Sequence, residues 1–258
     1  MPQTKIVFFD IDGTLIDMQA KKITPKMLET LHRLQDRGIK ICIATGRSPM
    51  VLPKIDGVAF DAYLTFNGSL CYDRKGVIFS NPIPHKDVVR FIQNAAALGR
   101  PVCVSTRDRL AANGTDTDLT DYFAIANEDV PIVDNFDAMC EEDIYQLMLG
   151  CRPKDYPALL DGAPGAKIAA WWDRAVDVIP AGGGKGIGIE KMLAYYGLDK
   201  TEALAFGDGN NDREMLQAVG TGVAMENGSP ELKAIADEIC GPVYEDGIYH
   251  YCADKGLI

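Results

Sequence analysis

The chain begins with an apolar run that ends abruptly in two acidic residues separated by one position. Four consecutive apolar residues within Lys5–Phe9 are typical of a strand that is buried on both faces of a sheet. In open α/β sheets, ligands bind in the crevice outside the carboxyl ends of the strands. Asp10 and Asp12 follow this strand directly, and Gly13-Thr14 predicts a loop there. The pattern indicates two carboxylates at a binding edge, although an isolated Asp-x-Asp-Gly is equally typical of an ordinary turn.

The next segment repeats the strand pattern after one helix. Thr24-Pro25 predicts a helix N-terminus, because proline favours the first helical position, and Gly38 predicts the stop. Ile39–Ile43 is a second apolar strand, which leads directly into Thr45-Gly46-Arg47. A strand, a helix and a strand at this spacing form a βαβ unit, whose strands are parallel neighbours. Thr45 is therefore expected at the same sheet edge as Asp10.

Size and charge restrict the class of protein. A chain of 258 residues favours one large domain or two smaller ones. Its 26 basic and 37 acidic residues give a net charge of −11, which argues against a general nucleic-acid or anionic-membrane binder. The odd number of cysteines, with no Cys-x-x-Cys pair and no leader segment, favours reduced thiols in a cytoplasmic protein. No apolar stretch reaches the roughly 20 residues that a membrane span needs.

A change of pattern in the middle of the chain predicts an inserted domain. Tyr63–Phe66, which ends in Asn67-Gly68, is a third strand that leads into a hairpin through Val77–Phe79. Two hinge candidates follow, at Asn81–Pro84 and Pro180–Gly184. Between them, runs of strands with separate helices replace the βα alternation. The predicted segments are helix 86–98, a strand pair within 102–112, and strands at 144–151, 167–172 and 175–179.

The alternation resumes after the second hinge candidate. A helix is predicted from Lys185, a strand at Ala203–Phe206, and a further helix from Ser229-Pro230. The expected fold is therefore α/β, with a doubly wound, mainly parallel Rossmann-like core. We assign residues 1–82 and 182–258 to this core, and residues 83–181 to an inserted α+β cap domain.

The predicted strand Ala203–Phe206 also passes directly into acidic and amide residues, in Gly207–Asp212. An EF-hand is excluded, because the twelfth position of that loop is Val219 where a glutamate is required. The Gly183–Gly186 segment lacks the glycine spacing and the Ser or Thr of a phosphate-binding P-loop. The polar residues expected at one sheet edge are Asp10, Asp12, Thr45, Lys185, Asp208, Asn211 and Asp212.

This set of residues predicts a metal site beside a phosphate site. Several carboxylates in one crevice repel one another unless a cation lies among them, and ligands that are all oxygen select Mg²⁺. Lys185, Thr45 and the Gly46 amide then supply donors for phosphate oxygens. Although the chain is acidic overall, its positive charges at this site, Lys185 and the metal ion, would thus be concentrated around a phosphorylated substrate.

The four segments together resemble the motifs of the haloacid dehalogenase-like (HAD) superfamily, in the same order. They are Asp10-Ile-Asp12-Gly13-Thr14, Thr45-Gly46-Arg47, Lys185 and Gly207–Asp212. The insertion resembles the type 2 cap of the Cof-type branch, as do Met225-Glu226-Asn227 and Asp246-Gly247 near the C-terminus. The resemblance covers essentially the whole chain. Gly228 is a minor departure, since many relatives carry alanine there.

The resemblance implies a Mg²⁺-dependent phosphatase of small phosphorylated metabolites, with sugar phosphates favoured. Asp10 would be the nucleophile that forms an aspartyl-phosphate, and Asp12 the general acid and base. Dehalogenase members lack the second aspartate, so Asp12 favours phosphoryl transfer. Mg²⁺ would be held by Asp10, the Asp12 carbonyl and Asp208. Phosphate would be bound by Thr45, Gly46, Lys185 and Asn211.

Supporting and specificity residues complete the expected site. Asp212, Thr14 and Arg47 would support the site from a second layer. Trp171 and Trp172 are candidates for substrate selection, since neighbours on a predicted strand face opposite sides and one of them would present its ring to the substrate. Two alternatives stay open, a phosphomutase on the same fold and a non-catalytic sensor of phosphorylated metabolites. The specific substrate and the oligomeric state do not follow from the sequence.

Overall fold

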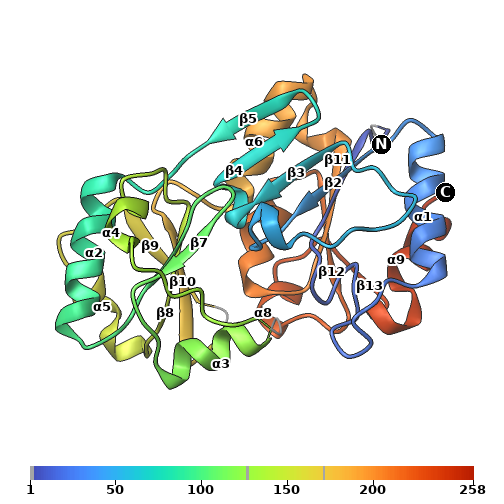
Figure 1. The fold of residues 1–258 in the computed structure, drawn as a ribbon. Coiled ribbons are helices and arrows are strands. Elements are labelled where there is room, and N and C mark those ends of the chain that lie inside the picture. Colours follow the sequence, from blue (N-terminus) through green and yellow to red (C-terminus); the bar gives the residue numbers. More distant parts are fainter. Residues whose placement is uncertain (1–2, 126–127, 171) are drawn as a thin grey trace. The chain divides into compact units, whose positions relative to one another are not determined.

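A computed structural model describes residues 3–125, 128–170 and 172–258 (Figure 1). The chain divides into two compact units. The core unit comprises Met1–Arg47, Pro53–Ser80 and Gly184–Ile258, and the inserted unit comprises Ser48–Leu52 and Asn81–Gly183.

The core unit is built on an eight-stranded sheet with the order β13-β12-β11-β1-β2-β3-β4-β5. All pairs from β13 to β3 are parallel, and β4 and β5 add an antiparallel edge. The predicted doubly wound, mainly parallel sheet is confirmed. In sheet order the strands are β13 (Glu238–Cys240), β12 (Thr221–Met225), β11 (Ala203–Gly207), β1 (Ile6–Phe9), β2 (Lys40–Ala44), β3 (Ala62–Thr65), β4 (Leu70–Asp73) and β5 (Gly76–Ser80).

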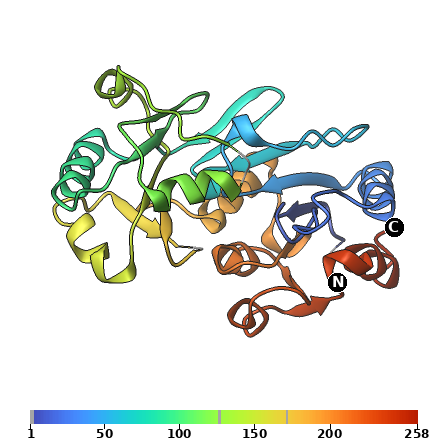
Figure 2. The same ribbon diagram turned by 60° about the horizontal axis from the view of Figure 1, so that its bottom comes forward.

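Helices cover both faces of this sheet. Phe8 of β1 packs in a buried cluster with α6 (Lys185–Tyr196), α7 (Arg213–Gln217) and α8 (Pro230–Lys233). Its neighbour Phe9 points to the other face, where it stacks on Phe206 at a ring distance of 5.5 Å. Phe206 in turn meets Tyr251 of α9 (Gly247–Asp254) edge to face. Helix α1 (Pro25–Asp36) lies beside α9 on this second face (Figures 1 and 2). The predicted N-cap is confirmed, since the hydroxyl of Thr24 accepts a hydrogen bond from the Met27 amide at 3.1 Å.

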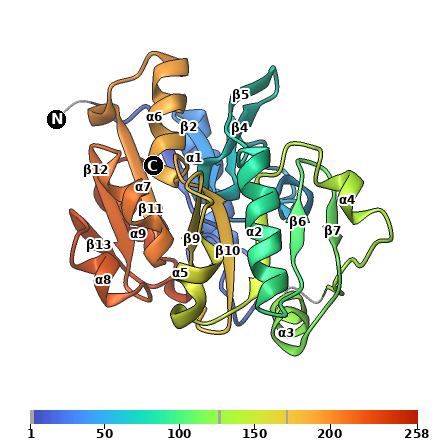
Figure 3. The same cartoon turned by 90° about the vertical axis from the view of Figure 1, so that its left-hand side faces the viewer.

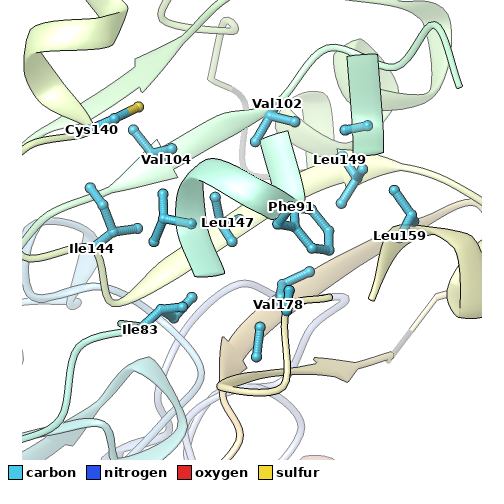
Figure 4. Packing of buried hydrophobic residues seen from close by; sticks show 14 of the residues in the cluster. Ile83, Phe91, Val102, Val104, Cys140, Ile144, Leu147, Leu149, Leu159 and Val178 are labelled. Carbon is cyan, nitrogen blue, oxygen red and sulfur yellow. The ribbon is translucent and has the colours of Figure 1, made fainter. Parts of the chain in front are cut away.

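The inserted unit has its own antiparallel sheet and its own core, with α2 over one face of the sheet (Figure 3). Phe91 of α2 is fully buried and packs among apolar side chains such as Val102, Leu149 and Val178 (Figure 4). Leu119 and Phe123 of α3 form a second cluster with Cys103. In sheet order the strands are β7 (Leu110–Ala112), β6 (Cys103–Ser105), β8 (Gln146–Gly150), β10 (Ala175–Pro180) and β9 (Ala166–Ala169). The helices are α2 (His85–Ala97), α3 (Thr117–Ile125), α4 (Phe136–Met139) and α5 (Tyr156–Leu159).

Short 3₁₀ turns link several of these elements. They lie at Pro49–Val51, Phe66–Gly68, Pro153–Asp155, Lys200–Glu202, Asn210–Asp212 and Val243–Glu245. Within the ranges that the structure describes, no helix is long and apolar enough to cross a membrane. The seven cysteines are free and buried, and the three histidines are exposed.

Two sequence-based expectations for the strands are wrong. The hairpin partner of β3 is β4, because the chain reverses directly at Asn67-Gly68. The Val77–Phe79 segment lies in β5, which pairs with β4. The predicted strand 167–172 ends early, because β9 stops at Ala169. Trp172 lies in the bend before β10, and its ring lies 5.1 Å from the guanidinium of Arg174. Trp171 lies outside the described residues, so the predicted opposition of the two rings stays a prediction.

Candidate active site

The polar residues of the core unit gather where its parallel strands end. Asp10 follows β1, and its amide still donates to the carbonyl of Phe206 on β11 at 3.0 Å. Asp208 follows β11, and Thr45 follows the neighbouring strand β2. Because all three strands are parallel, their carboxyl ends meet at one edge, as the sequence predicts.

Lys185 lies at the centre of this edge, at the first position of α6. Its side chain is fully buried, and its Nζ atom binds Oδ1 of Asp10 at 2.6 Å and Oδ1 of Asp212 at 2.5 Å. Burial alone would lower the pKa of Lys185, but the two carboxylates outweigh it and raise the pKa above its ordinary value. Lys185 therefore stays an ammonium ion inside the protein.

Asp212 holds both the lysine and the loop that precedes it. Its Oδ2 atom accepts hydrogen bonds from the amides of Asp208 and Gly209, both at 3.0 Å, while Oδ1 binds Lys185. The side chain is fully buried. Since both oxygens of Asp212 are engaged by protein donors, the residue braces the site and has little left to offer a ligand.

Replacing Lys185 with methionine should destabilise the core unit by about 3–5 kcal/mol, because two buried carboxylates would lose their counter-ion. The loss should shrink at low pH, because burial raises the pKa of Asp10 and its carboxylate then becomes protonated. Urea unfolding at pH 7 and pH 5 measures both effects. Lys191→Met, at an exposed position of the same helix, is the matched control. Equal stability of the two variants at pH 7 would contradict the role of Lys185 as the counter-ion of the two buried carboxylates.

Asp208 crosses closely over the loop after β1. The carboxylate accepts a hydrogen bond from the Thr14 hydroxyl at 3.4 Å. A Cβ atom on Gly13 would lie 2.2 Å from Oδ2 of Asp208, and Gly13 has a φ of +82°, so a side chain at this position is excluded. Burial and the neighbouring Asp212 raise the pKa of Asp208 to about 7.

The acidic cluster has the composition of a site for a hard divalent cation. Oxygen atoms of Asp10, Asp208 and Asp212 lie within 4.8 Å of one another. Burial and the nearby carboxylates of Asp212 and Asp208 raise the pKa of Asp10 well above its ordinary value, although Lys185 opposes this. An added cation would supply the missing positive charge. The donor set, which is all oxygen, fits Mg²⁺.

The side chain of Asp12 is not part of the acidic cluster. Its two oxygens accept hydrogen bonds from Nε and Nη2 of Arg47 at 2.8 and 2.6 Å. Both side chains are about one-third exposed. The sequence predicts both carboxylates at one binding edge, but only that of Asp10 joins the acidic cluster, while that of Asp12 binds Arg47. The chain turns immediately after β1, where the amides of Leu15 and Ile16 donate to the Ile11 carbonyl, so the alternation of an extended strand is lost.

Besides Lys185, the residues expected to bind phosphate follow β2 and β11 at the same edge. Thr45 is buried, its amide donates to the Leu64 carbonyl at 2.9 Å, and its hydroxyl accepts from the Arg47 amide at 3.1 Å. Asn211 is exposed, and its Nδ2 donates to Oδ1 of Asn67 at 3.2 Å. Sequence reasoning did not place Asn67 beside this site, because Asn-Gly was interpreted only as a turn. Its position directly after a strand of the parallel sheet was the available signal.

In a doubly wound α/β core, ligands bind at the carboxyl edge of the sheet, which is where Lys185 and the buried acids lie. The sequence model of the haloacid dehalogenase-like hydrolases matches residues 7–252, and the chain belongs to this family. The chain is similar to named phosphatases of this family, and it is an enzyme of the same hydrolase family.

Individual relatives match the chain over its whole length. The "Putative phosphatase YkrA" of Bacillus subtilis is 35% identical, with 99% of each chain covered. The 5-amino-6-(5-phospho-D-ribitylamino)uracil phosphatase YitU of the same organism is 28% identical, with 95% of each chain covered. The solved structure of the HAD subclass IIB sugar phosphatase BT4131 is 28% identical, with a TM-score of 0.88 over 99% of this chain and 100% of that one.

Proposed function

We propose that the protein is a Mg²⁺-dependent phosphatase that cleaves small phosphate monoesters through an aspartyl-phosphate on Asp10. The observation that carries this proposal is the buried Lys185, which holds Asp10 at 2.6 Å beside the acidic cluster. A carboxylate fixed in this way has one oxygen engaged by Lys185, so Oδ2 is the oxygen that we assign to the attack. Asp10 and Asp208, with the main-chain carbonyl of Asp12, would hold the metal.

The reaction divides into two displacements. In the first, Oδ2 of Asp10 forms a bond to phosphorus as the bond to the leaving oxygen breaks, and Asp12 gives that oxygen a proton. In the second, Asp12 takes a proton from water, which attacks phosphorus and releases Asp10. Bound Mg²⁺ supplies neutralisation of the negative charge on the phosphoryl group. Lys185, Thr45, Gly46 and Asn211 bind the same group and keep it in line with Asp10.

The pairing of Asp12 with Arg47 bears on the proton transfer. While both oxygens of Asp12 accept hydrogen bonds from Arg47, the carboxylate has no position for a proton on that side. Proton delivery to the leaving oxygen therefore requires that at least one of these two bonds opens. Arg47 thus acts as the positioning residue that holds Asp12 between turnovers.

Asp12→Asn should lower kcat by roughly 10²–10⁴-fold, because the amide can neither give nor take the proton. The Mg²⁺ concentration for half-maximal activity should stay close to that of the wild type, since the expected ligand is the main-chain carbonyl. Phosphate release at varied Mg²⁺ measures both quantities, with exposed Asp56→Asn as the control. A wild-type kcat in Asp12→Asn would remove Asp12 from the proton transfers.

Phosphorylated sugars and sugar-like compounds are the substrate class that we propose. The support is that similar proteins carry the names sugar phosphatase and phospho-D-ribitylamino-uracil phosphatase. We also propose that the inserted domain selects among these substrates, because the core residues recognise groups common to all phosphate esters. Trp172 stays a candidate for that selection. The cytoplasmic location inferred from the sequence also stays a proposal, supported by the free, buried cysteines.

A screen of phosphate release across sugar phosphates, nucleotides and cofactor phosphates tests the proposed reaction. We expect turnover with Mg²⁺ alone on at least one sugar phosphate. Turnover that requires a bisphosphate activator and yields an isomer would instead identify a phosphomutase. Absence of turnover across the screen, together with Mg²⁺-dependent ligand binding, would identify a sensor.

A further inference from the structure

The turn between β3 and β4 holds an unusual backbone. Phe66, Asn67 and Gly68 have φ angles of +50°, +53° and +84° in succession. Positive φ is costly for a bulky residue such as phenylalanine and tolerated mainly by glycine and asparagine. In the part of the chain that the structure describes, the next hydroxyl, that of Ser69, is buried without a hydrogen-bond partner. Strain of this kind persists where the surroundings impose it, and it clusters at functional sites.

The backbone of this turn contacts two segments of the active site. The amides of Phe66 and Asn67 donate to the carbonyls of Arg47 and Thr45 at 3.0 and 2.9 Å. Gly68 packs against the residue before Lys185, since a Cβ atom on Gly68 would lie 2.5 Å from the Gly184 carbonyl oxygen. The turn therefore positions the Thr45 loop and the start of α6 at the same time.

The side chain of Asn67 lies between two of the expected phosphate-binding residues. It is only 4% exposed, and its Oδ1 accepts a hydrogen bond from Nδ2 of Asn211 at 3.2 Å. The position that a Cβ atom on Gly46 would occupy lies 3.2 Å from Nδ2 of Asn67 and 3.3 Å from its Oδ1, so the amide group packs against Gly46. The amide thus bridges the loop after β2 and the loop after β11.

We propose that Asn67 is a further phosphate-binding residue, which orients Asn211 through Oδ1 and donates from Nδ2 to the phosphoryl group. This inference rests on the proposed function. With Oδ1 engaged by Asn211, the remaining capacity of the amide is its NH₂ group, a donor that an anionic oxygen accepts strongly. The left-handed backbone at Asn67 fits this role, because it places the amide between Gly46 and Asn211, and asparagine tolerates that conformation.

Asn67→Gly is the decisive variant, because glycine adopts positive φ freely and the substitution removes the amide without adding strain. We expect the affinity for inorganic phosphate, measured by calorimetry in the presence of Mg²⁺, to fall about 10-fold, as for a lost hydrogen bond to a charged group. Asn67→Asp keeps an acceptor for Asn211 but adds a negative charge, so it should weaken phosphate binding more than Asn67→Gly does. Lys21→Gly, at an exposed position with a φ of +50°, is the matched control and should leave phosphate affinity unchanged.

A double-mutant cycle separates the two roles of the side chain. If Asn67 orients Asn211, then Asn67→Gly combined with Asn211→Ala should cost less than the sum of the single variants. Full additivity would remove the orienting role. Phosphate affinities of both Asn67 variants within about two-fold of the wild type would overturn the inference, while wild-type turnover would still support the phosphatase. A wild-type protein that neither binds nor releases phosphate would instead overturn the proposed function.

Discussion

Asp10→Asn should lower phosphate release by roughly 10⁴-fold or more, as the loss of an enzyme's nucleophile commonly does. A neutral amide is a poor nucleophile, and the substitution also removes one of the carboxylates that we assign to the metal. Lys185 would keep Asp212 as a buried partner, so the ammonium ion would not be left unpaired. The variant should therefore fold, and its defect should lie in kcat.

The control for Asp10→Asn is the same substitution at an exposed aspartate. Asp56→Asn changes an exposed side chain of the core unit and should keep full activity. Asp10→Ala should be as inactive as Asp10→Asn, since neither side chain can form an acyl phosphate. Near-wild-type turnover in either Asp10 variant would remove Asp10 as the nucleophile.

Removal of divalent metal should silence the enzyme, and Mg²⁺ should restore it. Three carboxylates around one ammonium ion leave the acidic cluster with excess negative charge, which would repel the phosphoryl group. Ca²⁺ should not replace Mg²⁺, because it prefers more ligands and longer bonds. Asp10 would then bind Ca²⁺ through both oxygens, and neither would be free to attack phosphorus. Phosphate release in excess chelator, followed by titration with each cation, measures these effects.

Two further measurements, of thermal unfolding and of Mg²⁺ activation, make the metal test specific. Mg²⁺ should raise the thermal unfolding midpoint of the wild-type protein, since a ligand that binds the folded state stabilises it. Asp208→Asn should shift Mg²⁺ activation to higher concentrations, whereas Asp56→Asn should not. Full activity in excess chelator would contradict the assignment of Asp10 and Asp208 to a metal site.

The edge of the sheet could be predicted from sequence because its signals are local. Each apolar strand passes directly into its polar residues, as Phe9 does into Asp10 and Phe206 into the Asp208 loop. Parallel βα units then bring those ends together whatever the details of packing. The N-cap at Thr24 and the start of α6 at Lys185 follow from equally local patterns.

The pairing of side chains could not be predicted in this way, because it depends on residues distant in sequence. Arg47 binds Asp12 across 35 positions, and nothing in either motif alone indicates the contact. Asn67 binds Asn211 across 144 positions. The early end of β9 before Trp172 reflects the turn that an antiparallel partner requires, which apolar content alone does not locate.

The stereochemical course at phosphorus tests the central claim most directly. Each in-line displacement inverts the configuration at phosphorus. Hydrolysis of a substrate made chiral at phosphorus with sulfur and oxygen isotopes, in isotopically labelled water, should give a product with retained configuration, because attack by Asp10 and then by water inverts it twice. Inverted product would mean that water attacks the substrate in a single step, and would contradict the assignment of Asp10 as the nucleophile.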